Sequence, residues 1–151
     1  MSVEDNIKKL NIEIPNAPDP VGNYLPFVKS GNLIFISGQL PIDTNGKIIE
    51  GKIGLDLDVK SAEIATKIAI LNVLGQLKKA LGNLNLIKKC IKITGYYNCA
   101  KDFKDHPKIL NTASNLIVEL LGEKGKHTRV VVGVNSLPLN AAVEIETIFE
   151  I

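Results

Sequence analysis

The chain has 151 residues, enough for one domain that buries about 70% of the surface its unfolded form would expose. Hydrophobic residues make up 45% of the sequence and charged residues 23%, a composition that excludes a disordered or fibrous chain. The net charge is only +2 and the lysines are scattered in pairs, which argues against a nucleic-acid partner, because nucleic-acid-binding proteins usually concentrate Lys and Arg on one strongly basic face.

The start of the chain is rich in proline. We therefore predict an extended arm over residues 1–19, with one short edge strand at residues 11–14. The single folded domain is expected to span residues 20–151, since no repeat or linker divides it. No apolar run reaches the length of a signal peptide or a membrane span, so no membrane partner is expected.

The two cysteines, Cys90 and Cys99, both fall in one predicted strand. If that strand were straight they would lie about 30 Å apart, beyond the reach of a disulfide. We expect both to be free thiols in a reducing compartment, and hence a cytoplasmic protein.

The predicted elements begin with a hairpin. Residues 24–29 contain Pro26, which restricts them to an edge strand or a bulge, and a turn at residues 30–32 joins them to a strand at 33–37. Residues 43–56 have three glycines and are predicted to be a surface loop.

The spacing of the apolar residues then changes to that of a helix. Over residues 58–81 the apolar side chains recur at helical spacing, with Asp58 as N-cap and Gly82 as the stop. A strand at 87–97 and a second helix at 107–121 follow, and strands at 128–134 and 143–151 are expected to pair as a hairpin. This order predicts an α+β fold, a mixed sheet with both helices packed on one face.

Several familiar sites are missing from the sequence. His106 and His127 have no Cys or His neighbours at metal-ligand spacing, so no metal site is predicted. No glycine-rich phosphate loop and no GxSxG elbow occur, which argues against a nucleotide cofactor and a serine nucleophile. The remaining candidates for chemistry are an arginine, carboxylates, amides and backbone groups.

Arg129 stands out because it precedes a run of valines. Strand alternation lets Arg129 share a sheet face with Glu144, and we expect this to be the face away from the helices. The alternative is an ion pair on a half-wet sheet face, which would contribute little to stability.

Three segments together carry a resemblance: residues 20–41, residues 128–146, and Asn111 near the head of the second helix. The chain resembles the reactive intermediate deaminase family (Rid, YjgF-like), also labelled endoribonuclease L-PSP. The resemblance implies a chorismate-mutase-like fold of the bacillus type, assembled as a homotrimer with ligand clefts between neighbouring subunits. It also implies hydrolysis of enamines and imines, such as 2-aminoacrylate and 2-iminobutyrate, to 2-keto acids and ammonia without a cofactor.

The resemblance assigns roles to single residues. Arg129 matches the arginine that clamps the carboxylate of a small substrate, and Glu144 matches the glutamate that holds or activates the attacking water. Tyr24 matches an aromatic residue that lines the cleft, Gly38 a backbone contact, and Asn111 an asparagine near the cleft. Without the resemblance, Tyr24 could simply pack, Gly38 could serve a turn, and Asn111 could cap its helix.

This sequence departs from the family pattern at the predicted cleft. Val131 stands where the family often has cysteine, Ser114 replaces an aromatic residue, and the segment before Asn111 is one residue longer. These departures indicate a divergent subgroup, so a trimeric binding or regulatory module without turnover remains the alternative. A ribonuclease is less favoured, because aromatic residues are only 5% of the chain and single-stranded RNA is usually held by stacking aromatics.

Overall fold

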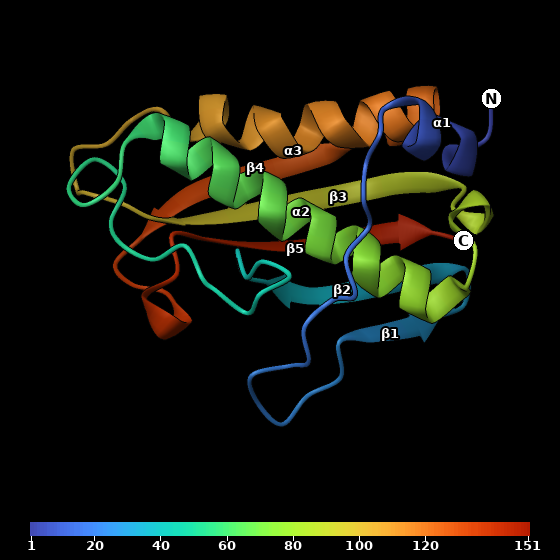
Figure 1. The fold of residues 1–151 in the computed structure, drawn as a ribbon, viewed down its shortest axis with the longest axis horizontal. Helices are drawn as coiled ribbons and strands as arrows, with labels where there is room; N and C mark the ends of the chain where they lie inside the picture. Colours follow the sequence, from blue (N-terminus) through green and yellow to red (C-terminus); the bar gives the residue numbers. More distant parts are fainter.

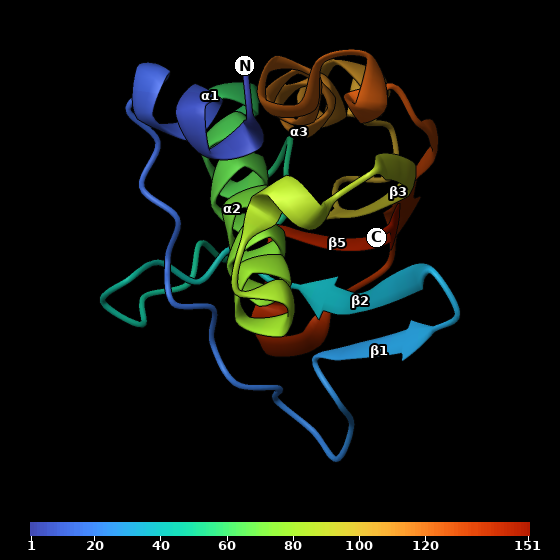
Figure 2. The ribbon, with the colours of Figure 1, turned by 90° about the vertical axis from the view of Figure 1, so that its right-hand side faces the viewer.

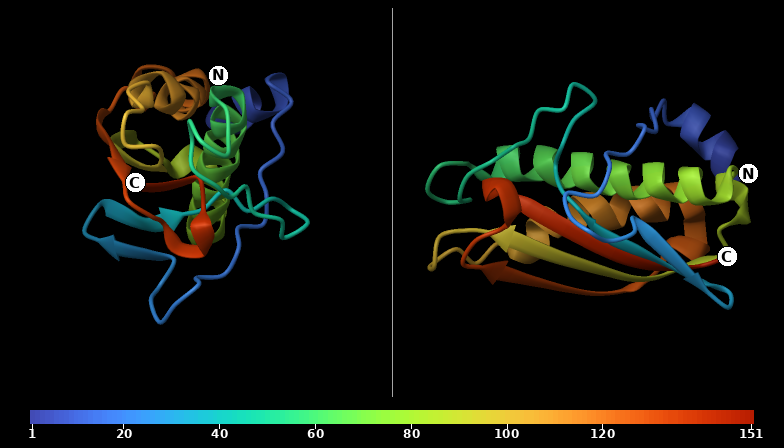
Figure 3. Two further views of the ribbon diagram at one scale, coloured as in Figure 1. Left: turned by 90° about the vertical axis from the view of Figure 1, so that its left-hand side faces the viewer. Right: turned by 90° about the horizontal axis from the view of Figure 1, so that it is seen from below.

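The computed structural model describes residues 1–151 and has two layers, a five-stranded sheet and a layer of helices (Figure 1). In sheet order the strands are β1 (Phe27–Ser30), β2 (Leu33–Gln39), β5 (Val143–Glu150), β3 (Lys89–Asn98) and β4 (Thr128–Val134). Only β3 and β4 run parallel. Helices α2 (Val59–Leu81) and α3 (His106–Leu121) cover one face, and no helix covers the other, which we call the bare face (Figures 2 and 3). The predicted α+β fold is confirmed.

Both long helices lie where the apolar period predicts them. The Asp58 carboxylate accepts a hydrogen bond from the Ser61 amide at 2.8 Å and so caps the start of α2. The helix ends at Gly82, whose φ of 74° suits a residue without a side chain. The apolar faces of the helices and the inner sides of the strands enclose one core of 29 residues. Three short 3₁₀ turns complete the chain: η1 (Leu84–Leu86), η2 (Gly122–Gly125) and η3 (Pro138–Asn140).

The prediction of an extended arm is wrong for the first residues. Val3–Lys9 form helix α1, and Ser2 and Asp5 hydrogen-bond to each other's backbone in a capping box at its start. Val3 and Ile7 are buried against the core, so α1 belongs to the folded body. The capping box and these two apolar residues favour a helix here, and no proline opposes it because all the prolines lie beyond the helix.

The stretch that follows α1 forms no strand, so the predicted edge strand at 11–14 is also wrong. This stretch crosses α2 (Figure 1). Gly75 of α2 allows the close approach, since a Cβ there would lie 2.5 Å from the Pro15 carbonyl oxygen. Gln76 then holds the same stretch by donating a hydrogen bond to the Pro18 carbonyl at 3.0 Å.

The predicted pairing of the last two strands is wrong as well. β3 lies between β4 and β5, pairing parallel with β4 and antiparallel with β5. Helix α3 makes the crossover from β3 to β4, as parallel neighbours require. Residues 135–142 therefore span the width of β3 instead of forming a hairpin turn.

Cys90 and Cys99 are both free thiols, as predicted. Cys90 is completely buried at the beginning of β3, and Cys99 follows the end of the same strand. None of the helices combines the length and the apolar character needed to cross a membrane.

Candidate functional site

Arg129 lies on β4, the edge strand of the sheet, directly opposite Ile93 of β3. Ile93 is a core residue, so Arg129 also points to the side of the helices. Its guanidinium donates to the Ser114 hydroxyl at 3.1 Å and to the Pro107 carbonyl at 3.3 Å, both on α3. The only ion pair in the chain joins Lys126 and Glu123. Arg129 is thus a half-buried cation held by neutral groups, with its charge free for a ligand.

A chain of hydrogen bonds fixes the Ser114 hydroxyl beside Arg129. His127 Nδ1 lies 2.6 Å from the Gly125 carbonyl oxygen, and its Nε2 lies 2.9 Å from the Ser114 hydroxyl. Because a carbonyl only accepts, Nδ1 carries the proton and Nε2 of a neutral ring accepts from Ser114. The Ser114 oxygen then accepts from Arg129, so His127 orients the arginine through one hydroxyl.

Asn111 lies on the side of α3 that carries Pro107 and Ser114, at helical spacings of four and three residues. Its side chain is exposed and makes no hydrogen bond to Arg129. The structure thus brings Asn111 to the neighbourhood of the arginine without a contact between them.

Glu144 lies on β5, opposite Tyr96 of β3, and projects from the bare face. Its carboxylate packs on Gly38, where any Cβ would overlap it. Burial raises the pKa of Glu144, and the negative charge of Glu146 raises it further. Tyr96 donates a hydrogen bond to Glu146 at 2.8 Å, which holds that second carboxylate in place.

Tyr24 belongs to the same group as Gly38. Both residues line a narrow cavity of about 20 Å³, although the Tyr24 ring remains 47% exposed. Gly38 thus lines the same cavity as Tyr24 and also packs against the Glu144 carboxylate.

The expectation that Arg129 and Glu144 share one face is wrong. Alternation groups Arg129 correctly with Val131 and Gly133, but this set faces the helices, and the exposed valines Val130 and Val132 occupy the bare face. With β3 between their strands, the two groups point away from each other. The candidate residues form two half-sites: Arg129, Asn111, Ser114 and His127 beside α3, and Tyr24, Gly38 and Glu144 toward the bare face.

Comparison with known proteins decides the family. A family model described as YjgF/chorismate mutase-like, putative endoribonuclease, matches residues 4–151. The chain belongs to the YjgF family. Protein TCP17 of Trypanosoma cruzi is 36% identical over 150 residues, which cover 99% of this chain and 94% of that protein. The YjgF-like resemblance of the sequence is thus confirmed.

One solved structure and one further relative are also similar to this chain. A protein of unknown function from Agrobacterium tumefaciens superimposes with a TM-score of 0.90 at 44% identity, covering 99% of this chain and 92% of that one. A relative from Dermatophagoides farinae carries the name 2-iminobutanoate/2-iminopropanoate deaminase. It is 27% identical over 138 residues, which cover 91% of this chain and 92% of that protein.

Within this YjgF-family chain, sequence reasoning missed the part played by His127. In the sequence, only the position of His127 next to Thr128 and Arg129 links it to the site. Its link runs through Ser114, thirteen residues earlier in the chain, which only the packing of α3 against β4 brings close. No cluster of three or more His, Cys, Asp or Glu side chains approaches the geometry of a metal site.

Proposed function

We propose that the protein hydrolyses small 2-imino acids and their enamine tautomers to 2-keto acids and ammonia, without a cofactor. The observation that carries this proposal is the half-buried Arg129 guanidinium, which has no carboxylate partner in the chain. A planar guanidinium binds a carboxylate through two parallel hydrogen bonds, so a small 2-imino acid fits it. The deaminase name of the Dermatophagoides farinae relative supports the same substrate class.

Glu144 would supply the water. In the proposed reaction its carboxylate takes a proton from a water molecule whose oxygen attacks the imine carbon, while the imine nitrogen is protonated. The resulting carbinolamine then loses ammonia as its hydroxyl proton is removed, which leaves the 2-keto acid. A raised pKa makes Glu144 a stronger base than an ordinary surface glutamate, and burial is the main cause of that shift.

The two half-sites would meet between copies of the chain. The bare face exposes Val28, Phe35, Val130 and Val132, each between 41% and 50% accessible. Val28 and Phe35 are direct partners on β1 and β2, while Val130 and Val132 lie on the opposite edge strand β4. We propose that this face is buried in a homotrimer, where Arg129 of one copy approaches Tyr24, Gly38 and Glu144 of the next.

Keto-acid release from 2-iminobutyrate tests the proposal. The imine is generated from an amino acid by an amino-acid oxidase, and the keto acid is measured with and without purified protein. We expect faster release with the wild type and none above background with Arg129→Ala. A wild type that fails to accelerate release from several amino-acid-derived imines would overturn the proposal.

A binding or regulatory module is the second candidate, because the unpaired arginine suffices to bind a 2-keto acid without catalysis. In that case 2-ketobutyrate should bind to the wild type in calorimetry, and Arg129→Ala should abolish binding. Glu144→Ala should leave the affinity unchanged, and turnover should be absent. For either function we place the protein in the cytoplasm, where two free thiols stay reduced.

A further inference from the structure

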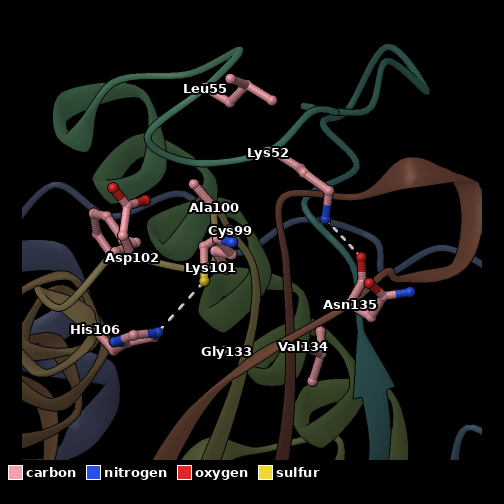
Figure 4. Close-up of a pocket in the computed structure, with 11 residues that line it drawn as sticks. Lys52, Leu55, Cys99, Ala100, Lys101, Asp102, His106, Gly133, Val134 and Asn135 are labelled. Carbon is pink, nitrogen blue, oxygen red and sulfur yellow. Dashed lines mark hydrogen bonds between the residues drawn. The ribbon is translucent and has the colours of Figure 1, made fainter.

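A cavity of about 600 Å³ opens at the end of β4, next to the start of α3 (Figure 4). Its walls come from the segment after β3, the first residue of α3, the end of β4 and the loop that carries Lys52. Its ionisable lining consists of the thiol of Cys99, the imidazole of His106 and the ammonium of Lys52, together with the exposed and oppositely charged Lys101 and Asp102. None of them takes part in the reaction proposed above.

Cys99 and His106 form a pair. The Cys99 sulfur lies 3.4 Å from His106 Nε2, within hydrogen-bond distance for a thiol (Figure 4). The His106 ring packs edge-on against Phe103, with centroids 5.1 Å apart, which fixes its orientation. A neutral imidazole accepts the thiol proton at Nε2, so the pair has the geometry of a nucleophile beside its base.

Gly133 makes room for this pair. A Cβ at Gly133 would lie 2.7 Å from the Cys99 sulfur and 2.7 Å from His106 Nε2. Real Cβ atoms do not tolerate such contacts, so any side chain there would push the sulfur and the imidazole out of place. The glycine pairs with Tyr97 of β3 in a regular strand, so its backbone conformation does not require glycine. The reason for a glycine at this position is therefore the space that Cys99 and His106 occupy.

Lys52 adds an unneutralised positive charge. Its ammonium donates to the Asn135 carbonyl at 2.6 Å (Figure 4). It also donates to the Asn98 side-chain oxygen at 2.9 Å. Both acceptors are neutral, and no carboxylate pairs with Lys52. An ammonium has three protons to donate, so one remains for a ligand in the cavity.

We propose that Cys99 is a nucleophilic thiol, with His106 as its base, that reacts with small anionic electrophiles held by Lys52. The sulfur attacks an electrophilic carbon and forms a C–S bond, while the thiol proton passes to His106 Nε2. The leaving group departs with the electron pair of the bond that breaks. Burial raises the pKa of Cys99, so the resting group is a thiol, and its reaction depends on the imidazole.

Two alkylating probes of nearly equal size test this proposal, iodoacetate with a negative charge and iodoacetamide without one. Alkylation of Cys99 is followed by mass spectrometry of peptides, with the neutral thiol N-acetylcysteinamide as reference. We expect the ratio of the iodoacetate rate to the iodoacetamide rate at Cys99 to exceed the reference ratio by about fivefold, the effect of one charge a few ångströms away in water. His106→Gln should slow both probes by about tenfold or more.

Variants of Lys52 and Lys108 show whether the preference for iodoacetate comes from the charge of Lys52. Lys52→Met should lower the ratio toward the reference value. Because the Lys52 charge also lowers the pKa of Cys99, this variant should slow iodoacetamide as well, but less than iodoacetate. Lys52→Arg should keep the preference for iodoacetate. Lys108→Met removes an exposed lysine outside the cavity and should change neither rate. Cys90, buried in the core with its pKa raised to about 12, should stay unlabelled in every correctly folded variant.

Two results would overturn the proposal. One is a Cys99 that reacts equally fast in the wild type and in His106→Gln. The other is a wild-type rate ratio equal to that of N-acetylcysteinamide. If labelling of Cys90 shows that His106→Gln or Lys52→Met has unfolded locally, the neutral variants His106→Asn and Lys52→Gln are used for the same comparison.

Discussion

Arg129 and Glu144 lie on opposite faces of one sheet, with strand β3 between the strands that carry them. Arg129 is paired with the core residue Ile93, and Glu144 is paired with Tyr96 on the bare face. A single copy of the chain therefore cannot apply both groups to one small substrate. If both act in one reaction, they must come from different copies.

This arrangement predicts complementation between two inactive variants. Arg129→Met and Glu144→Gln should each lose keto-acid release from 2-iminobutyrate. When the two variants are co-expressed with different tags and purified through both, sites that combine the intact Arg129 of one chain with the intact Glu144 of the next should appear. Purification through both tags removes the unmixed trimers. Each remaining cyclic trimer contains both variants and has a complete site at only one of its interfaces, so about one third of the wild-type activity should return.

The control mixes Arg129→Met chains carrying both tags, which contain no intact arginine and should stay inactive. Mixed assemblies that also remain inactive would show that the site does not form between subunits. Activity in either variant by itself would remove that residue from the mechanism.

Much of the fold follows from local patterns in the sequence. The helix over Val59–Leu81 combines an apolar period, an N-cap at Asp58 and a stop at Gly82, and these three signals agree on its bounds. Helix α1 has its own local signal, the pairing of Ser2 with Asp5, but it lies in a region that the prolines make look extended. Local chemistry thus predicts elements well wherever its signals agree.

The arrangement of the site depends on long-range pairing instead. Alternation divides the residues of β4 into two sets correctly, but it does not say which set faces the helices. The valines would ordinarily be assigned to the core, and here Val130 and Val132 lie on the bare face while Arg129 faces α3. Strand neighbours such as β3 and β4 are separated by a whole helix in the chain, so their pairing leaves no local trace.

The bare face leads to a prediction about assembly. Phe35 is 41% exposed there, next to Val28, and Phe35→Lys places a charge in the apolar area that we propose to be buried between copies. We expect the wild type to sediment as a trimer of 16.4 kDa chains and Phe35→Lys to sediment as a monomer that keeps its circular dichroism. Ile64→Lys is the matched control, because Ile64 is 51% exposed on α2 in the helix layer and should leave the trimer intact. A monomeric wild type would contradict the assembly.

Gly38 should be intolerant of even one methyl group. In Gly38→Ala the new Cβ would overlap the Glu144 carboxylate, which must then turn away. A displacement of a reacting group by about 1 Å can cost about a hundredfold in rate, so kcat/KM for imine hydrolysis should fall by about that factor. Binding of 2-ketobutyrate through Arg129, measured by calorimetry, should persist. Unchanged activity in Gly38→Ala would mean that the position of Glu144 does not matter for turnover.

The raised pKa of Glu144 also predicts how the free energy of unfolding depends on pH in a monomeric form of the protein. Its pKa in the folded state is raised above the ordinary value of 4.5, first by burial and then by Glu146. The folded state thus binds the proton more tightly than the unfolded state, and the free energy of unfolding falls as pH rises through this pKa. The stabilising contribution is complete below pH 4.5 and is lost at higher pH, so the ionised carboxylate destabilises the fold at neutral pH.

Replacement of this carboxylate by a neutral amide should remove the penalty. We expect Glu144→Gln to match its parent in urea unfolding at pH 4 and to exceed it increasingly toward pH 7. Both proteins should carry Phe35→Lys, so that no Arg129 from a neighbouring copy can approach Glu144 and so that the effect of the added lysine cancels. Glu150→Gln, on the same strand and face, serves as the matched control and should not reproduce this growing difference. A constant difference between pH 4 and pH 7 would show that Glu144 titrates alike in the folded and unfolded chain, and its raised basicity would then be no part of the mechanism.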